Sequence, residues 1–281
     1  MQNSFHKIYS SISKSIEGID TSIYIYADRK RRGYLPLRLM LSVLVYYSYL
    51  ACRSFKTFVQ EIVPTLLREV HATNISYNRW CVWRSKLSGL MQHITQEQVG
   101  VKAFKGVSLV DSTGLPVCAI QRERDHKCHS TTASKTMTSL GWMYGYKLHI
   151  ITSENGLILR WALKSANVHD VSLLKVEPFT AGLTGILMGD SAYTSTHVAS
   201  VLAAQSLSLV VKPKKKQLSK LFLFDEELAI YGKRWKIETV IGALKEHYGL
   251  RLSKKTRSFS TFMFCVCASL YLYQLLHPGI A

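Results

Sequence analysis

The chain has 281 residues, 47% of them hydrophobic, and its 36 Lys and Arg against 18 Asp and Glu give a formal net charge of +18. This length and apolar content suffice for one large core or two smaller ones and exclude a small disulfide scaffold. A positive charge of this size indicates a polyanionic partner, either nucleic acid or an anionic membrane surface.

Cysteine and apolar patterns narrow the class further. The six cysteines are scattered without a CxxC pair, which predicts reduced thiols in a cytoplasm. His126, Cys128 and His129 lack a second ligand pair at a suitable spacing, so no zinc site is expected. The N-terminus has no apolar signal-peptide segment. The apolar run 262–276 is shorter than the roughly 20 residues of a membrane span, so a buried terminal helix and no membrane partner are expected.

Residues 1 to about 100 have the apolar spacing of helices. Pro36 precedes leucines that recur at helical spacing, and it is placed to begin one helix. A second helix is expected from about Ser54 to His71, with a kink or break at Pro64. We therefore predict an all-helical N-terminal region over residues 1–100.

A third helix is expected over residues 76–93, with Ser76 able to cap it. Arg79 and Arg84 lie on it beside two tryptophans. One interpretation is a helical DNA-binding module whose last helix contacts duplex through these arginines. The other is a helical scaffold with a solvated basic face, and the sequence leaves both open.

The pattern changes near residue 100, and residues 101–281 read as a second domain, α/β in class. Three consecutive strands joined by hairpins are expected at 107–111, 142–152 and 157–164, whereas 121–140 is polar and has no clear period. The elements expected after them are a helix from about Val171, a buried strand ending at Asp190, a helix over 194–205, a strand over 207–211 and a helix over 231–249. This order predicts a mixed sheet with flanking helices.

The helix expected over 231–249 carries a polar stripe beside its apolar one. Tyr231, Arg234, Glu238, Gly242 and Lys245 share this stripe when the helix is wound at about 100° per residue. Arg234 precedes Glu238 by four positions, so the two side chains can meet. An ordinary surface ion pair worth about 0.3–0.5 kcal/mol would explain this spacing without any function.

Two aspartates end apolar strands. If the strands that end at Asp111 and Asp190 lie side by side, both carboxylates emerge at the same edge of the sheet, and a helix packed on the sheet can bring Glu238 to them. At a separation of about 4 Å, one pair of carboxylates repels by roughly 4 kcal/mol at an effective dielectric of 20. A divalent cation would remove this repulsion, and oxygen ligands favour Mg²⁺ or Mn²⁺ over zinc.

These features resemble a known family. The spacing from Tyr231 through Arg234 and Glu238 to Lys245 reproduces the Y-R-E-K signature of DDE-type transposases of bacterial insertion sequences, which have a ribonuclease-H-like catalytic core. The blocks LVDSTGLPVC, GYKLH, SANVHD and MGDSAY are similar to the family's blocks around its first aspartate, its second and third strands and its second aspartate. The most similar group is the nine-eighty-two insertion-sequence type, and the resemblance covers about residues 106–275.

The resemblance implies a role for each matched residue. Asp111, Asp190 and Glu238 would be the catalytic acids and would hold two Mg²⁺ ions, with Mn²⁺ as a substitute, for in-line phosphoryl transfer. Arg234 and Lys245 would hold DNA phosphates near the metals, and Tyr231 would contact the DNA nearby. Our own interpretation is that Gly242, on the same stripe, leaves room for the strand.

The implied function is a transposase that cleaves the terminal inverted repeats of its element and joins them to target DNA. It would act as a homo-oligomer in the cytoplasm, associated with the nucleoid. The alternatives are an inactive or domesticated DNA-binding protein and a nuclease without strand joining. Lys214 and Lys215 in the basic run 212–216 either track a DNA backbone or lie in a solvated loop. Asp170 is either a fourth acid or, as we favour here, a cap on the helix that follows it.

Overall fold

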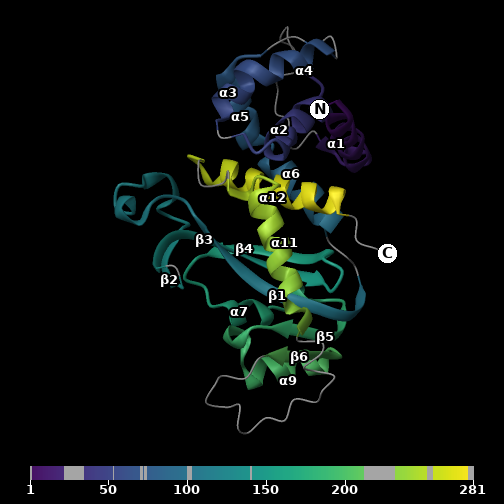
Figure 1. Ribbon diagram of the computed structural model, residues 1–281, viewed down its shortest axis with the longest axis vertical. Coiled ribbons are helices and arrows are strands. Elements are labelled where there is room, and N and C mark those ends of the chain that lie inside the picture. The colour runs from purple at the N-terminus through teal and green to yellow at the C-terminus, as the bar shows by residue number, and fades with distance from the viewer. Residues whose placement is uncertain are drawn as a thin grey trace. The chain divides into compact units, whose positions relative to one another are not determined.

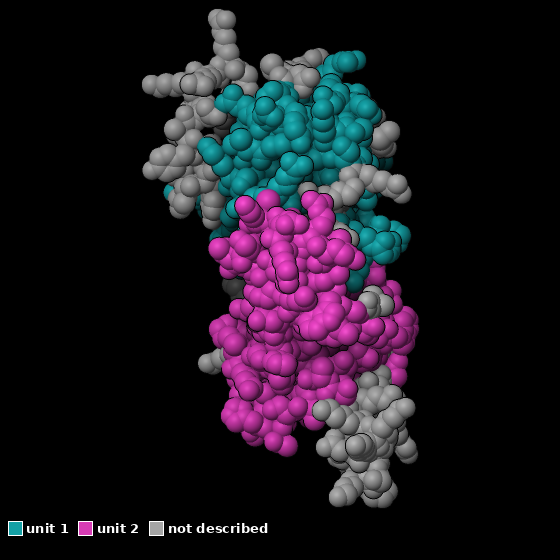
Figure 2. Space-filling model, turned by 90° about the vertical axis from the view of Figure 1, so that its left-hand side faces the viewer, with its two compact units in different colours: residues 1–98, 243–276 teal, residues 99–242, 277–281 magenta. Residues whose placement is uncertain are grey.

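The computed structural model describes residues 2–21, 35–52, 54–69, 72, 75–99, 103–139, 141–211, 232–251 and 256–277. The chain divides into two compact units, which Figure 2 colours separately. Unit 1 consists of residues 1–98 and 243–276, and unit 2 of residues 99–242 and 277–281. The first division lies close to the boundary expected near residue 100, but the chain returns to unit 1 after Gly242. The functional division into an end-binding region 1–100 and a catalytic domain 101–281 stays a prediction.

Unit 1 is helical, as expected for the N-terminal region (Figure 1). Its elements are α1 (Gln2–Ile16), α2 (Leu37–Tyr49), α3 (Phe55–Thr57), a π-helical turn (Phe58–Ile62), α4 (Val63–Glu69), α5 (Tyr77–Lys86), α6 (Ser88–Val99) and α12 (Phe259–Leu276).

Two of the expected N-terminal helices are built differently. The backbone around Pro64 stays helical, but a π-turn precedes it, in which the N–H of Val63 bonds to the carbonyl of Phe58. Proline lacks an N–H and crowds the preceding turn, and a wider π-turn accommodates both. The single helix expected over 76–93 is divided at Leu87 into α5 and α6, and Ser76 takes the N-cap position without a side-chain hydrogen bond.

Helix α12 forms the centre of unit 1, as expected for a buried terminal helix. Thirteen of its 18 residues are buried, and it packs against α1, α2 and α5. The hydroxyls of Ser11 and Tyr271 lie 2.7 Å apart, and Thr95 donates to the carbonyl of Cys267 at 3.2 Å. By length and composition α12 is apolar enough to cross a membrane, but 72% of that stretch is buried inside the protein. Its hydrophobicity is therefore that of a core helix.

Unit 2 contains a six-stranded mixed sheet in the order β2-β3-β1-β5-β6, with β4 also paired to β3. Its strands are β1 (Phe104–Pro116), β2 (Ser134–Thr138), β3 (Gly141–Ser153), β4 (Ile158–Ser165), β5 (Leu183–Gly189) and β6 (Leu207–Val211). Its helices are α7 (Asp170–Leu174), α8 (Glu177–Thr180), α9 (Thr196–Ala204) and the first part of α11 (Trp235–Glu246).

Strand β2 was not expected, because it lies in the polar stretch 121–140. It pairs with residues 141–145 of β3, and β4 pairs with residues 146–152 of the same strand. The long β3 is antiparallel to β1 along its other edge. Strands β1, β5 and β6 run parallel to one another. The three expected strands are present, and β1 extends from Phe104 to Pro116 rather than over 107–111.

One face of the sheet is covered by α7, α8 and α9. Leu173 of α7 and Leu202 of α9 belong to the same buried cluster as Val110 of β1 and Leu187 of β5. This cluster anchors both strands that lead to the aspartates of the predicted triad. Removing its apolar surface from water is the main force that fixes their positions.

Candidate active site

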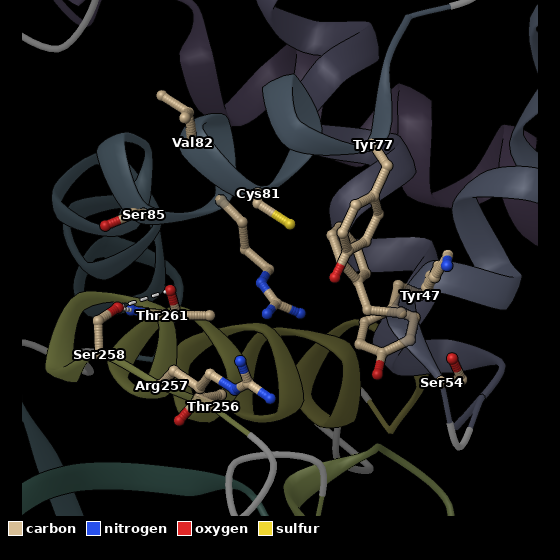
Figure 3. Close-up of a pocket in the computed structure, with 13 residues that line it drawn as sticks. Tyr47, Ser54, Tyr77, Cys81, Val82, Ser85, Thr256, Arg257, Ser258 and Thr261 are labelled. Carbon is tan, nitrogen blue, oxygen red and sulfur yellow. Dashed lines mark hydrogen bonds between the residues drawn. The ribbon is translucent and has the colours of Figure 1, made fainter. Parts of the chain in front are cut away.

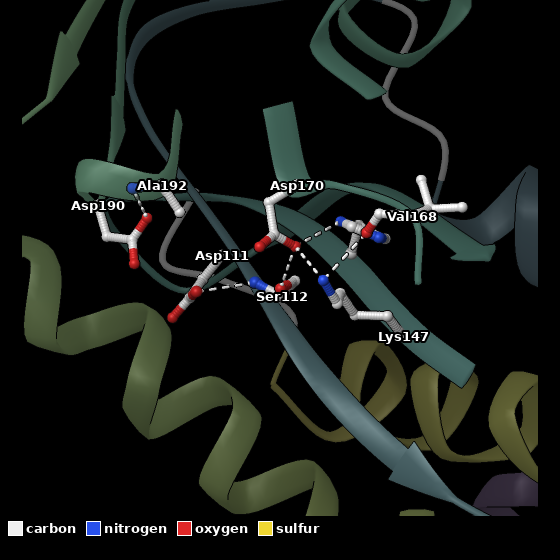
Figure 4. A network of polar contacts seen from close by, with 8 residues as sticks. Asp111, Ser112, Lys147, Val168, Asp170, Asp190 and Ala192 are labelled. Carbon is white, nitrogen blue, oxygen red and sulfur yellow. Dashed lines mark hydrogen bonds and ion pairs between the residues drawn. The ribbon is translucent and has the colours of Figure 1, made fainter. Parts of the chain in front are cut away.

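Asp111 and Asp190 lie at one edge of the sheet. Strands β1 and β5 are parallel, and Leu109 pairs with Met188 in the last described step of their register. Each aspartate lies two positions beyond its strand's member of that pair. The register therefore places the two aspartates at matching positions of neighbouring strands, and Figure 4 shows them on adjacent segments. Asp190 directly follows β5, as expected, whereas Asp111 lies within β1, which continues to Pro116 in its pairing with β3.

Both carboxylates are held by the backbone next to them. Asp111 Oδ1 accepts from the N–H of Ser112 at 2.8 Å, and Asp190 Oδ1 accepts from the N–H of Ala192 at 2.8 Å, capping the 3₁₀ turn 191–193. Burial raises the pKa of Asp111 to about 6, although the Ser112 N–H and the Arg234 guanidinium lower it. The Asp190 and Glu238 carboxylates raise it further. Asp111 therefore carries a negative charge that its surroundings only partly balance.

Gly189 allows Asp190 to leave the sheet where it does. A Cβ atom on Gly189 would lie 2.9 Å from a ring carbon of Tyr193 and 3.1 Å from a methyl of Val110. Tyr193 is 1% exposed and is the last residue of the turn that Asp190 caps. The glycine is required here by close packing, because any larger side chain would push the aspartate-bearing turn away.

Arg234 links Asp111 to the third acid of the predicted triad. It lies in a 3₁₀ turn, Gly232–Arg234, that leads into α11. Its guanidinium nitrogens are 3.5 Å from Asp111 Oδ2 and 3.5 Å from Glu238 Oε1. The i,i+4 pair considered from sequence is therefore present, but Glu238 is 60% exposed and Arg234 also reaches the more buried Asp111. The α-helix runs from Trp235 to Glu246, shorter than the 231–249 expected.

The structure contains the carboxylates predicted to bind metal, but it does not bring three of the described ones close enough to hold an ion. Within the part of the chain that the structure describes, no three His, Cys, Asp or Glu side chains are close enough to hold a metal ion. Asp111 and Glu238 instead share the positive charge of Arg234. The carboxylate oxygens at this edge are the ligand type that Mg²⁺ and Mn²⁺ prefer. These donors fit a hard divalent cation in kind, and the triad as a metal site stays a prediction.

A polar network behind Asp111 was not foreseen. Asp170 Oδ1 accepts from Ser112 Oγ at 2.7 Å and pairs with Lys147 Nζ at 3.1 Å, and His149 Nδ1 lies 3.7 Å away (Figure 4). Lys147 also donates to the carbonyl of Val168 at 3.0 Å. We call Ser112, Lys147, His149 and Asp170 the polar network.

The network corrects the favoured interpretation of Asp170. It is the first residue of α7 rather than its cap, because the N-cap position belongs to His169, which makes no capping side-chain bond. Its carboxylate faces β1 and β3 instead. The sequence signal was two polar residues, Lys147 and His149, on one face of an otherwise apolar strand. Recognising its meaning required the pairing of Ser112 with His149 across the two strands.

The other predicted DNA-binding residues are dispersed. Lys245 lies on α11 but belongs to unit 1, since the division between the units falls within that helix. Arg79 and Arg84 lie on α5, where Arg79 is 5.8 Å from the ring of Trp83 and Arg84 is 4.1 Å from the ring of Phe55. The remaining three predicted residues lie outside the described residues: Tyr231, Lys214 and Lys215.

Comparison with known proteins assigns the chain to a family. No curated protein matches the sequence. Among solved structures, the chain is similar to a piggyBac transposase synaptic complex with hairpin DNA (9% identity, TM-score 0.46, 95% of this chain and 74% of that one). It is also similar to a pre-cleavage Mos1 transpososome (12% identity, TM-score 0.21, 90% and 83%). The assignment rests on the family model of the transposase DDE domain, which matches residues 101–258, more than half of the chain and all three predicted acids. The protein belongs to the DDE-domain transposases.

Proposed function

We propose that this transposase cleaves the ends of a DNA element and joins them to target DNA by divalent-metal-dependent phosphoryl transfer. The observation that carries the proposal is the placement of Asp111 and Asp190 two positions beyond the last parallel pair of β1 and β5, with Arg234 linking Asp111 to Glu238. All four residues lie within the stretch that matches the DDE domain. We also propose that the chain belongs to the nine-eighty-two insertion-sequence group and that it carries the Y-R-E-K signature.

Asp111, Asp190 and Glu238 would hold two Mg²⁺ ions, or Mn²⁺ in their place. Bound there, the ions would supply Lewis-acid polarisation of the scissile phosphate and stabilise the charge on the leaving oxygen. The protein's own part is to fix the oxygen donors in place. The Ser112 and Ala192 N–H groups do this for Asp111 and Asp190, and Arg234 favours the charged form of Asp111.

Arg234 would also bind the DNA backbone. Its guanidinium already lies between two carboxylates, and a planar guanidinium can pair with a phosphate through two parallel hydrogen bonds. Lys245 and Tyr231 would add contacts further along the strand. Lys214 and Lys215 would attract the backbone without reading its sequence.

The partners would be the terminal inverted repeats of the element and a target duplex, bound by a homo-oligomer. The net charge of +18 and the helical unit 1 with Arg79 and Arg84 support DNA binding. We place the protein in the cytoplasm, on the nucleoid.

The test is an incubation of the full chain with labelled element-end duplex and Mg²⁺, scored for nicked and joined products. Asp111→Asn, Asp190→Asn and Glu238→Gln should each lose both products by about a thousandfold, because charge stabilisation at the reacting phosphate is lost. Glu246→Gln is the matched control, since Glu246 lies on the same helix as Glu238 and pairs with Arg251 instead of Arg234.

The products separate the alternatives. Nicks without joined strands would indicate a nuclease. Binding with neither product, at normal folding, would indicate an inactive DNA-binding protein. Normal cleavage by any one of the three variants would remove that residue from the triad.

A further inference from the structure

Unit 1 contains an open cavity that the transposase chemistry does not use. Its volume is about 610 Å³, within the roughly 300–1,000 Å³ typical of small-ligand pockets. It is lined by the end of α2 and the start of α3, by one face of α5, and by the turn that begins α12 (Figure 3). Every lining residue belongs to unit 1. We call it the cationic cavity.

The charge of its lining is one-sided. Lys56, Arg84 and Arg257 line it, and none of the thirteen described lining residues is an Asp or a Glu. The Arg84 guanidinium lies over the ring of Phe55 at 4.1 Å and near that of Tyr47 at 5.8 Å. Its Nε atom is buried and makes no hydrogen bond to any described residue. An arginine stays charged, and a partly buried charge without a counter-charge favours binding of an anion.

The start of α12 adds to this preference. Ser258 accepts from the N–H of Thr261 at 3.2 Å, and its hydroxyl lies 2.8 Å from that of Thr261. The first turn of this 18-residue helix carries no acid, so the partial positive charge of its N-terminus adds to that of the side chains. Five serines and threonines in the lining offer further hydroxyl donors: Ser54, Ser85, Thr256, Ser258 and Thr261.

The cavity also has an aromatic side. Figure 3 shows Tyr47 and Tyr77 across from Ser258 and Thr261. The rings of Phe55 and Tyr77 are 6.0 Å apart and tilted by 50°. Phosphate alone needs no aromatic surface and far less space. Aromatic rings beside cations are the combination that binds unpaired nucleotides, by stacking on the base and pairing with the phosphate.

We propose that the cationic cavity binds one unpaired nucleotide, with its phosphate on Arg84 and Arg257 and its base against Tyr77. A base in intact duplex is stacked and paired and does not enter a cavity of this kind, so the ligand is a nucleotide at a frayed or single-stranded segment, or a free mononucleotide. The first source rests on the proposed function, because it requires the protein to engage DNA.

Equilibrium binding of the full chain tests the proposal without metal and without cleavage. The probes are a fluorescein-labelled single-stranded 12-mer, the blunt duplex of the same sequence, and a mononucleotide competitor. Arg257→Gln should weaken single-strand binding by about tenfold, as expected for loss of a charge-assisted phosphate contact. Tyr77→Leu should weaken it by a similar factor through lost stacking. Both should change duplex binding by less than about twofold, since bulk phosphate contacts remain.

The control is Arg38→Gln, which removes the same charge from an exposed position on α2 outside the cavity. Equal losses for Arg38→Gln and Arg257→Gln, or equal losses on single strand and duplex, would overturn the proposal. Displacement of the 12-mer by mononucleotide would support the site and assign it to free nucleotides. Failure to displace it, with the losses above, would assign it to strand segments.

Photocrosslinking of a 5-iodouracil 12-mer supplies a direct readout for a variant that folds poorly. The wild-type crosslink should map to the peptide that contains Tyr77 or Tyr47, and a crosslink that maps only to unit 2 would contradict the assignment. Because neither measurement needs catalysis, a protein that binds in this way but never cleaves would refute the proposed function alone. A protein that cleaves but shows no cavity-dependent binding would refute this inference alone.

Discussion

The acidic edge of unit 2 and the cationic cavity of unit 1 carry opposite charge in differently built surroundings. At the edge, Asp111 and Glu238 share one guanidinium, and backbone N–H groups and the polar network hold Asp111 and its neighbour in place. In the cavity, three cations lie among hydroxyls and rings with no described acid in the lining. The acids at the edge are held by specific ion pairs and hydrogen bonds, whereas the cations of the cavity have no acid in its described lining to balance them. We therefore expect single changes at the edge to act on chemistry, and changes in the cavity to act on affinity.

The largest effect should come from removing unit 1's helices. The sequence alone favours a fragment 101–281 that folds by itself, but α12 lies among α1, α2 and α5. Without residues 1–98, its thirteen buried residues lose their cover, and an apolar surface of this kind drives aggregation. Fragment 101–281 should be insoluble, and fragment 101–251, which lacks α12, should be recovered in larger soluble yield. The measurement is soluble yield with far-ultraviolet circular dichroism. Equal solubility of both fragments would show that α12 does not depend on residues 1–98.

The polar network is the next target. Asp170→Asn removes the carboxylate that pairs with half-buried Lys147 and accepts from Ser112. Leaving that lysine without its partner should cost about 1–3 kcal/mol of unfolding free energy. Cleavage should fall by about ten- to a hundredfold, because Ser112 N–H holds Asp111 and small displacements there are costly.

The matched control is Glu123→Gln, which breaks the more exposed 2.9 Å pair with Lys135 in the same unit. It should cost less than about 1 kcal/mol and leave cleavage unchanged. If the two variants lost stability and activity alike, Asp170 would be only one more surface acid.

The sequence predicts the acids of the edge from simple rules of strand geometry, but those rules do not predict the polar network. Asp111 and Asp190 are predicted to meet on the condition that their two strands lie side by side, and the parallel pairing of β1 with β5 supplies that condition. The contact of Asp170 with Ser112 and Lys147 depends on cross-strand register, which local periodicity does not set. Strand β2 is held by pairing with β3 rather than by an apolar pattern of its own. Likewise, α12 belongs to unit 1 because it packs against helices far away in the sequence, which local sequence patterns do not predict.

Arg234 and Lys245 sharpen the comparison within one helix. Arg234→Gln removes the cation shared by Asp111 and Glu238, so cleavage should fall by up to about a hundredfold through lost positioning. Unfolding free energy should change by at most about 1 kcal/mol, because the Glu238 side of the pair is exposed. Lys245→Gln should lower the cleavage rate less, since Lys245 lies seven residues beyond Glu238. Melting temperature, DNA affinity and cleavage rate are measured on one preparation. If both variants lost stability but kept the natural cleavage rate, the two residues would have only a structural role.

The smallest expected effect is a pH dependence of stability from His149. Its side chain is fully buried, and neither ring nitrogen makes a hydrogen bond to a described residue. Burial lowers its pKa to about 4; Asp170 opposes this shift, and Lys147 and Lys164 add to it. The unfolded chain, with a histidine pKa near 6.5, therefore binds more protons between about pH 6.5 and 4, and the free energy of unfolding falls as pH falls through that window.

His149→Leu removes this difference in proton binding. Denaturant titrations at pH 7 and pH 5 should show a loss on acidification that is smaller by about 1–2 kcal/mol than in the natural protein. At pH 7 the change should be near neutral, because the leucine replaces a buried ring whose nitrogens lack partners. His197→Gln, at an exposed position on α9, is the control and should leave the acid loss unchanged. If the His149→Leu protein lost as much stability on acidification as the natural chain, groups elsewhere would set the acid sensitivity, and the polar network would be a fixed scaffold behind Asp111 at every pH tested.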